Sequence, residues 1–450
     1  MNTTPLYKTS SKRPKRELKK VLGLSFGIAV MVGGIIGVGI LRNPGSVATF
    51  IPDKWLIISA WVFGGVYVLL ALGSLAELAT MLPKAGGIFN YVKRAFGNYA
   101  GFITGWFAYI INAIAPAYFV IAISEYLSLL FPILKGFEAL IAISILGAFT
   151  LLNLVSVKNG SVTQQLTSFI KVFALLVLVI CCLLFGANTE PAAVTYNLSN
   201  ILVQGGVLLA FIQALQLAVG TYDGWDSPVF FAEEDSNPGK NIPRSLFIGA
   251  IIVMIVYVMI NIALLYVLPV ASVAGSKLAV ADAAHVIFGE TGYTIITLTA
   301  IFSLLSILNA QLMICSRLLY GLSREGFFIN SGTLINKGGT PYVALIITTL
   351  IALGLVLIGS FEQLFTLGAF MSMLVSILMF ASVFKLRKTA PELPRPYKAW
   401  GYPWVTLLIL LISIALFISY AFGDTKNFLF ILVIIAFTWP AYRLIKRQQS

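Results

Sequence analysis

Charge is scarce in this sequence. Charged residues make up 10% of the 450 residues, against 59% hydrophobic residues, and the mean hydropathy is +0.95. A water-soluble globule cannot bury so much apolar surface, so we expect the chain to lie in a lipid bilayer. The apolar runs are continuous rather than alternating, which excludes a β-barrel and predicts an all-α membrane protein.

Cysteine and histidine are nearly absent too. Cys181, Cys182 and Cys315 all lie in apolar runs, so we expect neither a disulfide framework nor a metal site. The single histidine, His285, falls in a predicted outer loop, and no nucleophile stands beside a base in a recognisable motif. We therefore predict that the protein is not an enzyme and needs no cofactor.

Twelve apolar runs are long enough to cross a bilayer, which takes about 20 helical residues. The first and the sixth are interrupted by helix breakers. The approximate limits are 21–50, 55–82, 100–131, 137–156, 163–186, 204–233, 244–269, 293–320, 341–359, 362–385, 403–422 and 427–443.

The basic residues orient these spans. Of the 30 lysines and arginines, we place 24 on one face, four on the other and two, Arg42 and Lys171, inside spans. Because basic residues accumulate in the cytoplasm, both termini are predicted to be cytoplasmic in a cell membrane, inner or plasma. The formal charge of +13 is then explained by the orientation of the spans in the membrane, and we expect no nucleic-acid binding. Residues 1–20 and 444–450 form cytoplasmic tails, the first being too polar for a signal peptide.

The two interrupted spans break at membrane depth. The first contains the run GGIIGVGILRNPG (33–45) and the sixth the run GTYDGWDSP (220–228). Gly costs about 1 kcal/mol and Pro about 3 kcal/mol inside a helix, although isolated glycines also serve close helix packing. The breaks begin five helices apart, which predicts two inverted five-helix repeats, 21–186 and 204–385, followed by helices 11 and 12 (403–443). Matched breaks of this kind point to a transporter's binding site.

The freed backbone supplies the chemistry of that site. The first N–H groups after the first break have no intrahelical acceptor and suit a carboxylate, whereas carbonyls at the ends of the half-helices suit an ammonium. Together they would hold the zwitterion of an amino acid. The predicted substrate-binding residues at the breaks are Ile35, Ile36, Gly37, Val38, Gly39, Ile40, Val219, Gly220, Tyr222, Asp223, Gly224 and Asp226.

Three stretches resemble signatures of the amino acid, polyamine and organocation transporter superfamily, and within it the branch of L-type transporters and bacterial exchangers. They are GIIGVGI (34–40), AELATMLPKAGGIFNYVKRAFG (76–97) and YDGWDSPVFFAEEDSNPGKNIPRSL (222–246). The resemblance, which extends over spans 1 to 10, implies a LeuT-type fold with interrupted helices 1 and 6 that works by alternating access. It also implies that the helix 1 glycines bind the substrate carboxylate and that Trp225 or Tyr222 covers the substrate.

The resemblance also bears on partners. In animal L-type transporters a cysteine in the loop after helix 3 joins a heavy chain, and the corresponding loop here, FPILKGFE (131–138), contains no cysteine. We therefore expect no disulfide-linked heavy chain.

Lys171 lies inside the fifth span, where a lysine is costly by about 2.5 to 3.5 kcal/mol. Its side chain either reaches the interface along the helix or has a function inside the membrane. The resemblance implies the second: a helix 5 lysine takes the place of sodium in proton-linked relatives. Its ammonium would bridge helix 1 to helix 8 near Ser303 and Ser306, so that transport needs no sodium.

The acids of the sixth span allow two interpretations. Asp226 suits the N-cap of the second half-helix, since Ser227 and Pro228 follow it. Alternatively, Asp226 or Asp223 faces the cavity and attracts a cationic substrate or a proton. Arg42, just beyond the first break, would pair with an acid such as Glu125 or serve an outer gate.

The sequence therefore predicts a secondary active transporter of neutral L-amino acids, an exchanger or a proton-linked and sodium-independent carrier. A carrier of cationic amino acids or polyamines with the same fold is the alternative. A channel or a membrane sensor is remote, because the sequence has neither a continuous polar pore nor a sizeable soluble domain.

Overall fold

The structure is a computed structural model that describes residues 22–155, 157–186, 206–359, 361–423 and 425–447, together with Leu18 and Lys20. Most of the predicted tail 1–20, and the last three residues of the tail 444–450, lie outside the described residues. The elements are α1 (Leu24–Ile35), α2 (Val38–Phe50), α3 (Lys54–Met81), α4 (Ile88–Phe96), α5 (Asn98–Leu130), η1 (Pro132–Leu134), α6 (Glu138–Val155), α7 (Val157–Phe185), α9 (Gly206–Thr221), η3 (Ser227–Phe231), α10 (Pro238–Val267), α11 (Val270–Val273), α12 (Ala279–Arg324), η4 (Asn330–Thr333), α13 (Tyr342–Ile358), α14 (Phe361–Thr389), α15 (Trp404–Gly423) and α16 (Thr425–Arg447).

Helices account for the regular structure of the described residues, apart from two isolated bridges. Eight helical segments there are long and apolar enough to cross a membrane by length and composition. Four shorter apolar helices lie where further spans are predicted, within α9, α13, α15 and α16. The prediction of an all-α membrane protein is confirmed at this level.

Two helices extend beyond the predicted spans. The α12 segment begins at Ala279 and contains two helices that join across a kink at Gly289, whose φ is 63°, so the second of them starts close to the predicted limit of 293. His285 therefore lies on a helix and not in a loop. The α7 helix begins at Val157, earlier than predicted, and this places Lys171 at the centre of its 29 residues.

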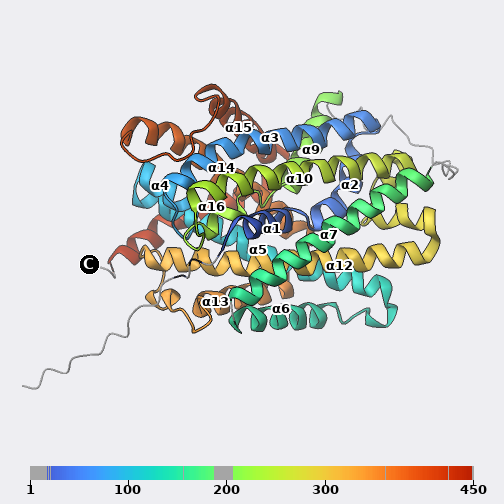
Figure 1. Ribbon diagram of the computed structural model, residues 1–450, viewed down its shortest axis with the longest axis horizontal. Coiled ribbons are helices and arrows are strands. Elements are labelled where there is room, and N and C mark those ends of the chain that lie inside the picture. Colours follow the sequence, from blue (N-terminus) through green and yellow to red (C-terminus); the bar gives the residue numbers. More distant parts are fainter. Residues whose placement is uncertain are drawn as a thin grey trace, which may run out of the picture.

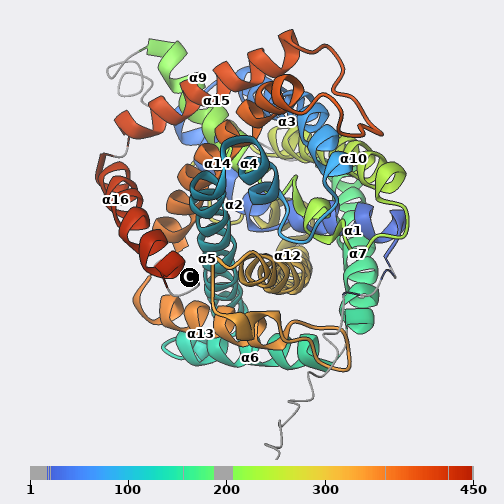
Figure 2. The same ribbon diagram turned by 90° about the vertical axis from the view of Figure 1, so that its left-hand side faces the viewer.

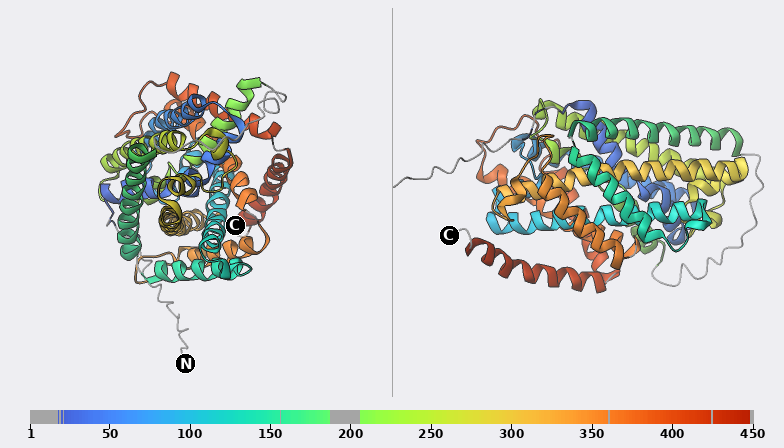
Figure 3. Two further views of the ribbon diagram at one scale, coloured as in Figure 1. Left: turned by 90° about the vertical axis from the view of Figure 1, so that its right-hand side faces the viewer. Right: turned by 90° about the horizontal axis from the view of Figure 1, so that it is seen from below.

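The helices form an elongated bundle that runs along the long axis of the molecule (Figure 1). Seen from its end, α5 and α12 stand next to each other in the interior, with α6 and α13 below them (Figure 2). The helix α16 lies at the periphery (Figure 3). The broken helix pair α1–α2 is enclosed by α7, α9, α10 and α12, so its interruption occurs in the protein interior and not against lipid.

Candidate substrate site at two helix breaks

The first break separates α1 from α2. The helix α1 ends at Ile35, Ile36 is extended with φ −72° and ψ 97°, and α2 begins at Val38. Gly37 precedes α2 and supplies no side-chain cap. The first N–H groups of α2 are therefore without intrahelical acceptors, at the positive end of the helix dipole.

The second break lies between α9 and η3. The helix α9 ends at Thr221, residues 222–226 form turns, and the 3₁₀ helix η3 begins at Ser227. Gly224 adopts φ 93°, a left-handed conformation that favours glycine, and the Ser227 hydroxyl donates to its carbonyl at 2.5 Å. Both predicted interruptions are thus confirmed.

The two breaks touch. A Cβ atom at Gly224 would lie 2.9 Å from the carbonyl oxygen of Gly34, and one at Gly34 would lie 2.7 Å from the Ser227 hydroxyl. Tyr257 of α10 joins the breaks as well, because its hydroxyl donates to the Ile35 carbonyl at 2.7 Å and to the Thr221 carbonyl at 3.3 Å. Glycine at both positions is what lets the main chains approach this closely.

Lys171 donates hydrogen bonds to the main chain of the first break. Its Nζ donates to the carbonyls of Gly33 at 3.1 Å, Ile36 at 2.7 Å and Ser303 at 3.3 Å, and the residue is 2% exposed. The side chain thus points into the bundle and does not extend to the interface. It links α1 to α12 as expected near Ser303, whereas Ser306 accepts from Thr167 at 2.8 Å.

These contacts involve several carbonyls of the predicted ammonium site. The carbonyl of Ile35 accepts from Tyr257 and that of Ile36 from Lys171, while the carbonyls of Val219 and Gly220 accept N–H groups of the following turn. Carbonyls expected to await a cation are therefore already engaged by the protein. Each carbonyl oxygen has a second lone pair, so the role of these carbonyls toward an ammonium stays a prediction, and acidic side chains are the other candidates.

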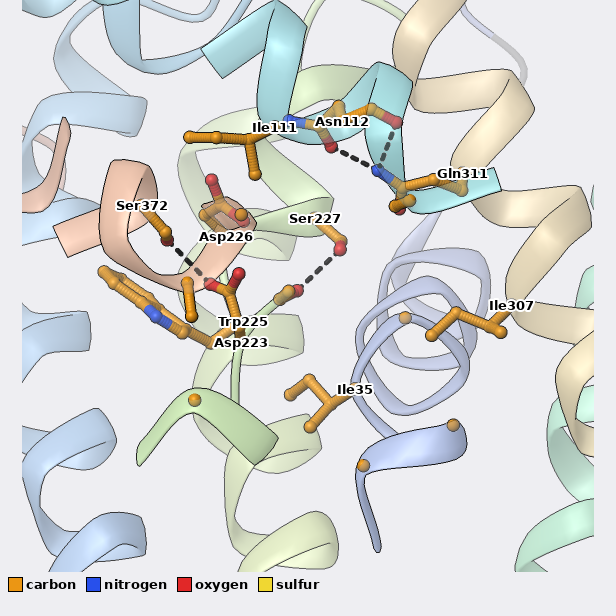
Figure 4. A pocket seen from close by; sticks show the side chains of 18 of the residues that line it. Ile35, Ile111, Asn112, Asp223, Trp225, Asp226, Ser227, Ile307, Gln311 and Ser372 are labelled. Atoms are coloured by element: carbon orange, nitrogen blue, oxygen red, sulfur yellow. Dashed lines mark hydrogen bonds between the residues drawn. The ribbon is translucent and has the colours of Figure 1, made fainter. Parts of the chain in front are cut away.

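A cavity of about 90 Å³ opens where the breaks meet (Figure 4). Of the predicted residues, those that line it are Ile35, Gly37, Gly39, Gly220, Asp223, Gly224, Trp225 and Asp226. Ile36, Ile40, Val219 and Tyr222 are buried but do not line it, and the side chain of Val38 lies outside the described residues. Tyr222 packs against Trp61 and Tyr257, so of the two predicted aromatics only Trp225 reaches the cavity.

The cavity wall carries two acidic side chains, Asp223 and Asp226. Asp223 accepts a hydrogen bond from the Ser372 hydroxyl at 3.0 Å. Asp226 does not act as an N-cap, because its carboxylate makes no capping hydrogen bond to η3, so the N-cap interpretation is wrong. Among the described residues that line the cavity there is no lysine, arginine or histidine, so neither acid meets a cation there.

Sequence reasoning missed several polar residues of this wall. Asn112 of α5, Gln311 of α12 and Ser372 of α14 all line the cavity. A polar amide inside a long apolar run was the available signal, but it does not say which way a side chain points. Figure 4 shows the Asn112 and Gln311 side chains meeting at a part of the wall away from Asp223 and Trp225.

Several ion pairs link the helices outside the cavity lining. Arg317 and Glu234 form a fully buried bidentate pair, with 2.9 Å between Nε and Oε1, and Arg324 pairs with Glu233 at 2.7 Å. Beyond the first break, Arg42 pairs with Glu125 at 3.3 Å, as the sequence suggested.

A backbone contact accompanies the Arg42 pair. The Gly275 N–H donates to the Gly45 carbonyl at 3.0 Å, and a Cβ at Gly45 would clash with the main chain of Ser276. We expect Gly45→Ala to slow transport about tenfold, since inserting a methyl group into such a contact costs about 1 to 3 kcal/mol. Initial rates of uptake into proteoliposomes measure this. Gly147→Ala, where the added Cβ meets nothing within 4 Å, is the matched control and should keep the wild-type rate.

Comparison with known proteins identifies the chain. The sequence profile described as amino acid permease matches residues 22–439. The chain belongs to the amino acid permease family. This permease is 28% identical to the serine/threonine exchanger SteT of Bacillus subtilis over 441 residues, covering 96% of this chain and 98% of that protein.

Two animal proteins are similar over most of the permease. The b(0,+)-type amino acid transporter 1 of Mus musculus is 29% identical, and the aligned region covers 90% of this chain and 89% of that protein. The large neutral amino acids transporter small subunit 2 of the same species is 30% identical, and the aligned region covers 88% of this chain and 76% of that protein. The permease is therefore a multi-pass membrane transporter of amino acids and not an enzyme.

Proposed function

We propose that this permease carries small neutral L-amino acids across a cell membrane by alternating access, as an exchanger or a proton-linked carrier. In this proposal the chain has twelve spans in a LeuT-type arrangement, with inverted repeats at 21–186 and 204–385 and both termini in the cytoplasm. The observation that carries it is the contact between two helix breaks around one buried cavity. Half-helices that end at a common cavity offer main-chain groups to a zwitterion.

The size of the cavity supports a small substrate. Its accessible volume of about 90 Å³ is small, so a small amino acid would fit with less rearrangement of the wall than a large aromatic one.

The charges support one orientation of that substrate. Its carboxylate would lie against the first N–H groups of α2, and its ammonium would pair with Asp223, which Ser372 holds in place. Trp225 would cover the substrate from the second break. Lys171, with Ser303 and Ser306 beside it, would occupy the place of a coupling cation, so we propose that uptake needs no sodium.

Counterflow tests the proposal. Proteoliposomes loaded with unlabelled serine should accumulate labelled serine or alanine transiently, at equal rates with and without an imposed sodium gradient. A channel would show no counterflow, because it has no binding site that crosses from one side of the membrane to the other with substrate bound. Stimulation by the sodium gradient would contradict the role given to Lys171.

A second candidate substrate is a cationic amino acid or a polyamine. The observation that favours it is the pair of carboxylates, Asp223 and Asp226, in a cavity whose described lining has no basic side chain. Asp223 would take the α-ammonium and Asp226 a second positive group.

Two isosteric variants separate the candidates. We expect Asp223→Asn to reduce serine counterflow at least tenfold, since a hydrogen-bonded charge pair contributes about 1.5 to 3 kcal/mol. Asp226→Asn should leave serine counterflow within about twofold of wild type. Should the wild type instead carry lysine or putrescine, and Asp226→Asn lose that activity alone, the second candidate would replace the first.

A further inference from the structure

Asn112 and Gln311 are two amide side chains that the zwitterion does not use. Asn112 lies in the middle of α5 and Gln311 on α12, the two helices that pack against each other inside the bundle. Both line the cavity and both are half-buried. Their neighbours in the wall include apolar side chains such as Ile111 and Ile307.

The contacts of the pair fix the orientation of both amides. The Asn112 amide contacts the Ala108 carbonyl at 2.7 Å, and because a carbonyl only accepts, the contacting atom is Nδ2. The Oδ1 atom of Asn112 then faces Gln311 and accepts from its Nε2 at 2.5 Å. The same Nε2 also donates to the main-chain carbonyl of Asn112 at 3.3 Å, so both its hydrogens are used.

Two hydrogen-bonding functions remain. Each amide group carries two N–H donors and one oxygen acceptor. Within the described residues, the second N–H of Asn112 and the Oε1 atom of Gln311 have no hydrogen-bond partner. The joined amides thus keep one donor and one acceptor without a partner among the described residues, and both residues line the cavity (Figure 4).

A hydroxyl group can form hydrogen bonds with a donor and an acceptor at the same time. A hydroxyl group donates one hydrogen bond and accepts others, whereas a methyl group does neither. A methyl group at this place would leave the two amide functions unpaired, which sites that bind hydroxyl groups use to reject apolar analogues. A carboxamide would also match, but asparagine and glutamine are larger than serine and threonine, and the cavity is small.

We propose that Asn112 and Gln311 form a specificity subsite for the side-chain hydroxyl of a small amino acid. The subsite rests on the proposed function, because it presupposes an amino acid held at the two breaks. It makes serine preferred over alanine, and threonine preferred over valine, which has the same shape as threonine. Asn112 and Gln311 thereby determine specificity without holding the carboxylate or the ammonium.

Competition by shape-matched amino acids tests the subsite. Threonine should inhibit counterflow of labelled serine at a concentration about tenfold lower than valine does in the wild type. In Gln311→Met the ratio of the two inhibitory concentrations should fall to about one, with valine inhibiting as well as before or better. Asn112→Leu should have the same effect on the ratio and replaces Gln311→Met if that variant does not fold.

The matched control is Gln216→Met. Gln216 is a buried glutamine of α9 whose amide donates to the Leu416 carbonyl at 3.3 Å, and it does not line the cavity. This variant should keep the wild-type ratio. Equal inhibition by threonine and valine in the wild type, or an unchanged ratio in Gln311→Met, would overturn the subsite. The proposed function would still stand in that case, provided that serine counterflow is observed. Absence of counterflow with every amino acid would overturn the proposed function and the subsite with it.

Discussion

Replacing Lys171 by methionine is expected to reduce counterflow at least tenfold. The ammonium is the common donor to the carbonyls of Gly33, Ile36 and Ser303, and methionine fills similar space without donating. A hydrogen bond from a charged donor contributes about 1.5 to 3 kcal/mol, so losing these bonds would let the first break rearrange. Initial rates of serine counterflow measure the effect, and size-exclusion chromatography checks that the variant folds.

Lys54→Met is the control for this prediction, because Lys54 is exposed at the start of α3 and the substitution is the same. It should transport at the wild-type rate. A lysine that merely reached the interface could be replaced without loss. Wild-type counterflow in Lys171→Met would therefore mean that the ammonium does not maintain the break.

Replacing Gly39 by leucine is expected to abolish counterflow, with a loss of at least about a hundredfold. Gly39 lines the cavity in the first turn of α2, where the carboxylate is proposed to bind. Its Cβ alone would lie 2.8 Å from the Thr221 Cγ2 atom and 3.3 Å from the Thr221 Cα atom. A leucine would both fill the cavity and separate α2 from α9, and overpacking of this kind costs about 1 to 3 kcal/mol or more.

Gly354→Leu is the matched control, since Gly354 lies on α13 and a Cβ there meets nothing within 4 Å. It should fold and transport like the wild type. Gly39→Ala should fall between the two leucine variants, because it adds the close contact with Thr221 but little bulk. Normal counterflow in Gly39→Leu would place the carboxylate somewhere other than the N-terminus of α2.

The sequence by itself determined the class of the protein and the position of its helix breaks. Hydropathy depends on composition along one helix, so it predicts spans without knowledge of their neighbours. Glycine and proline act on the local backbone, which is why both interruptions, at 36–37 and 222–226, are where the runs of breakers are. The cost of a charge in lipid likewise marked Lys171 as a residue that needs partners.

Only the tertiary structure decided which groups are left for a substrate. The carbonyls of Ile35 and Ile36 are freed by the first break, but Tyr257 and Lys171 arrive from other helices and engage them. Asn112 and Gln311 lie about two hundred positions apart and meet because α5 packs on α12. A hydrogen bond depends on the distance and angle between two atoms, and for residues far apart along the chain these are set by helix packing.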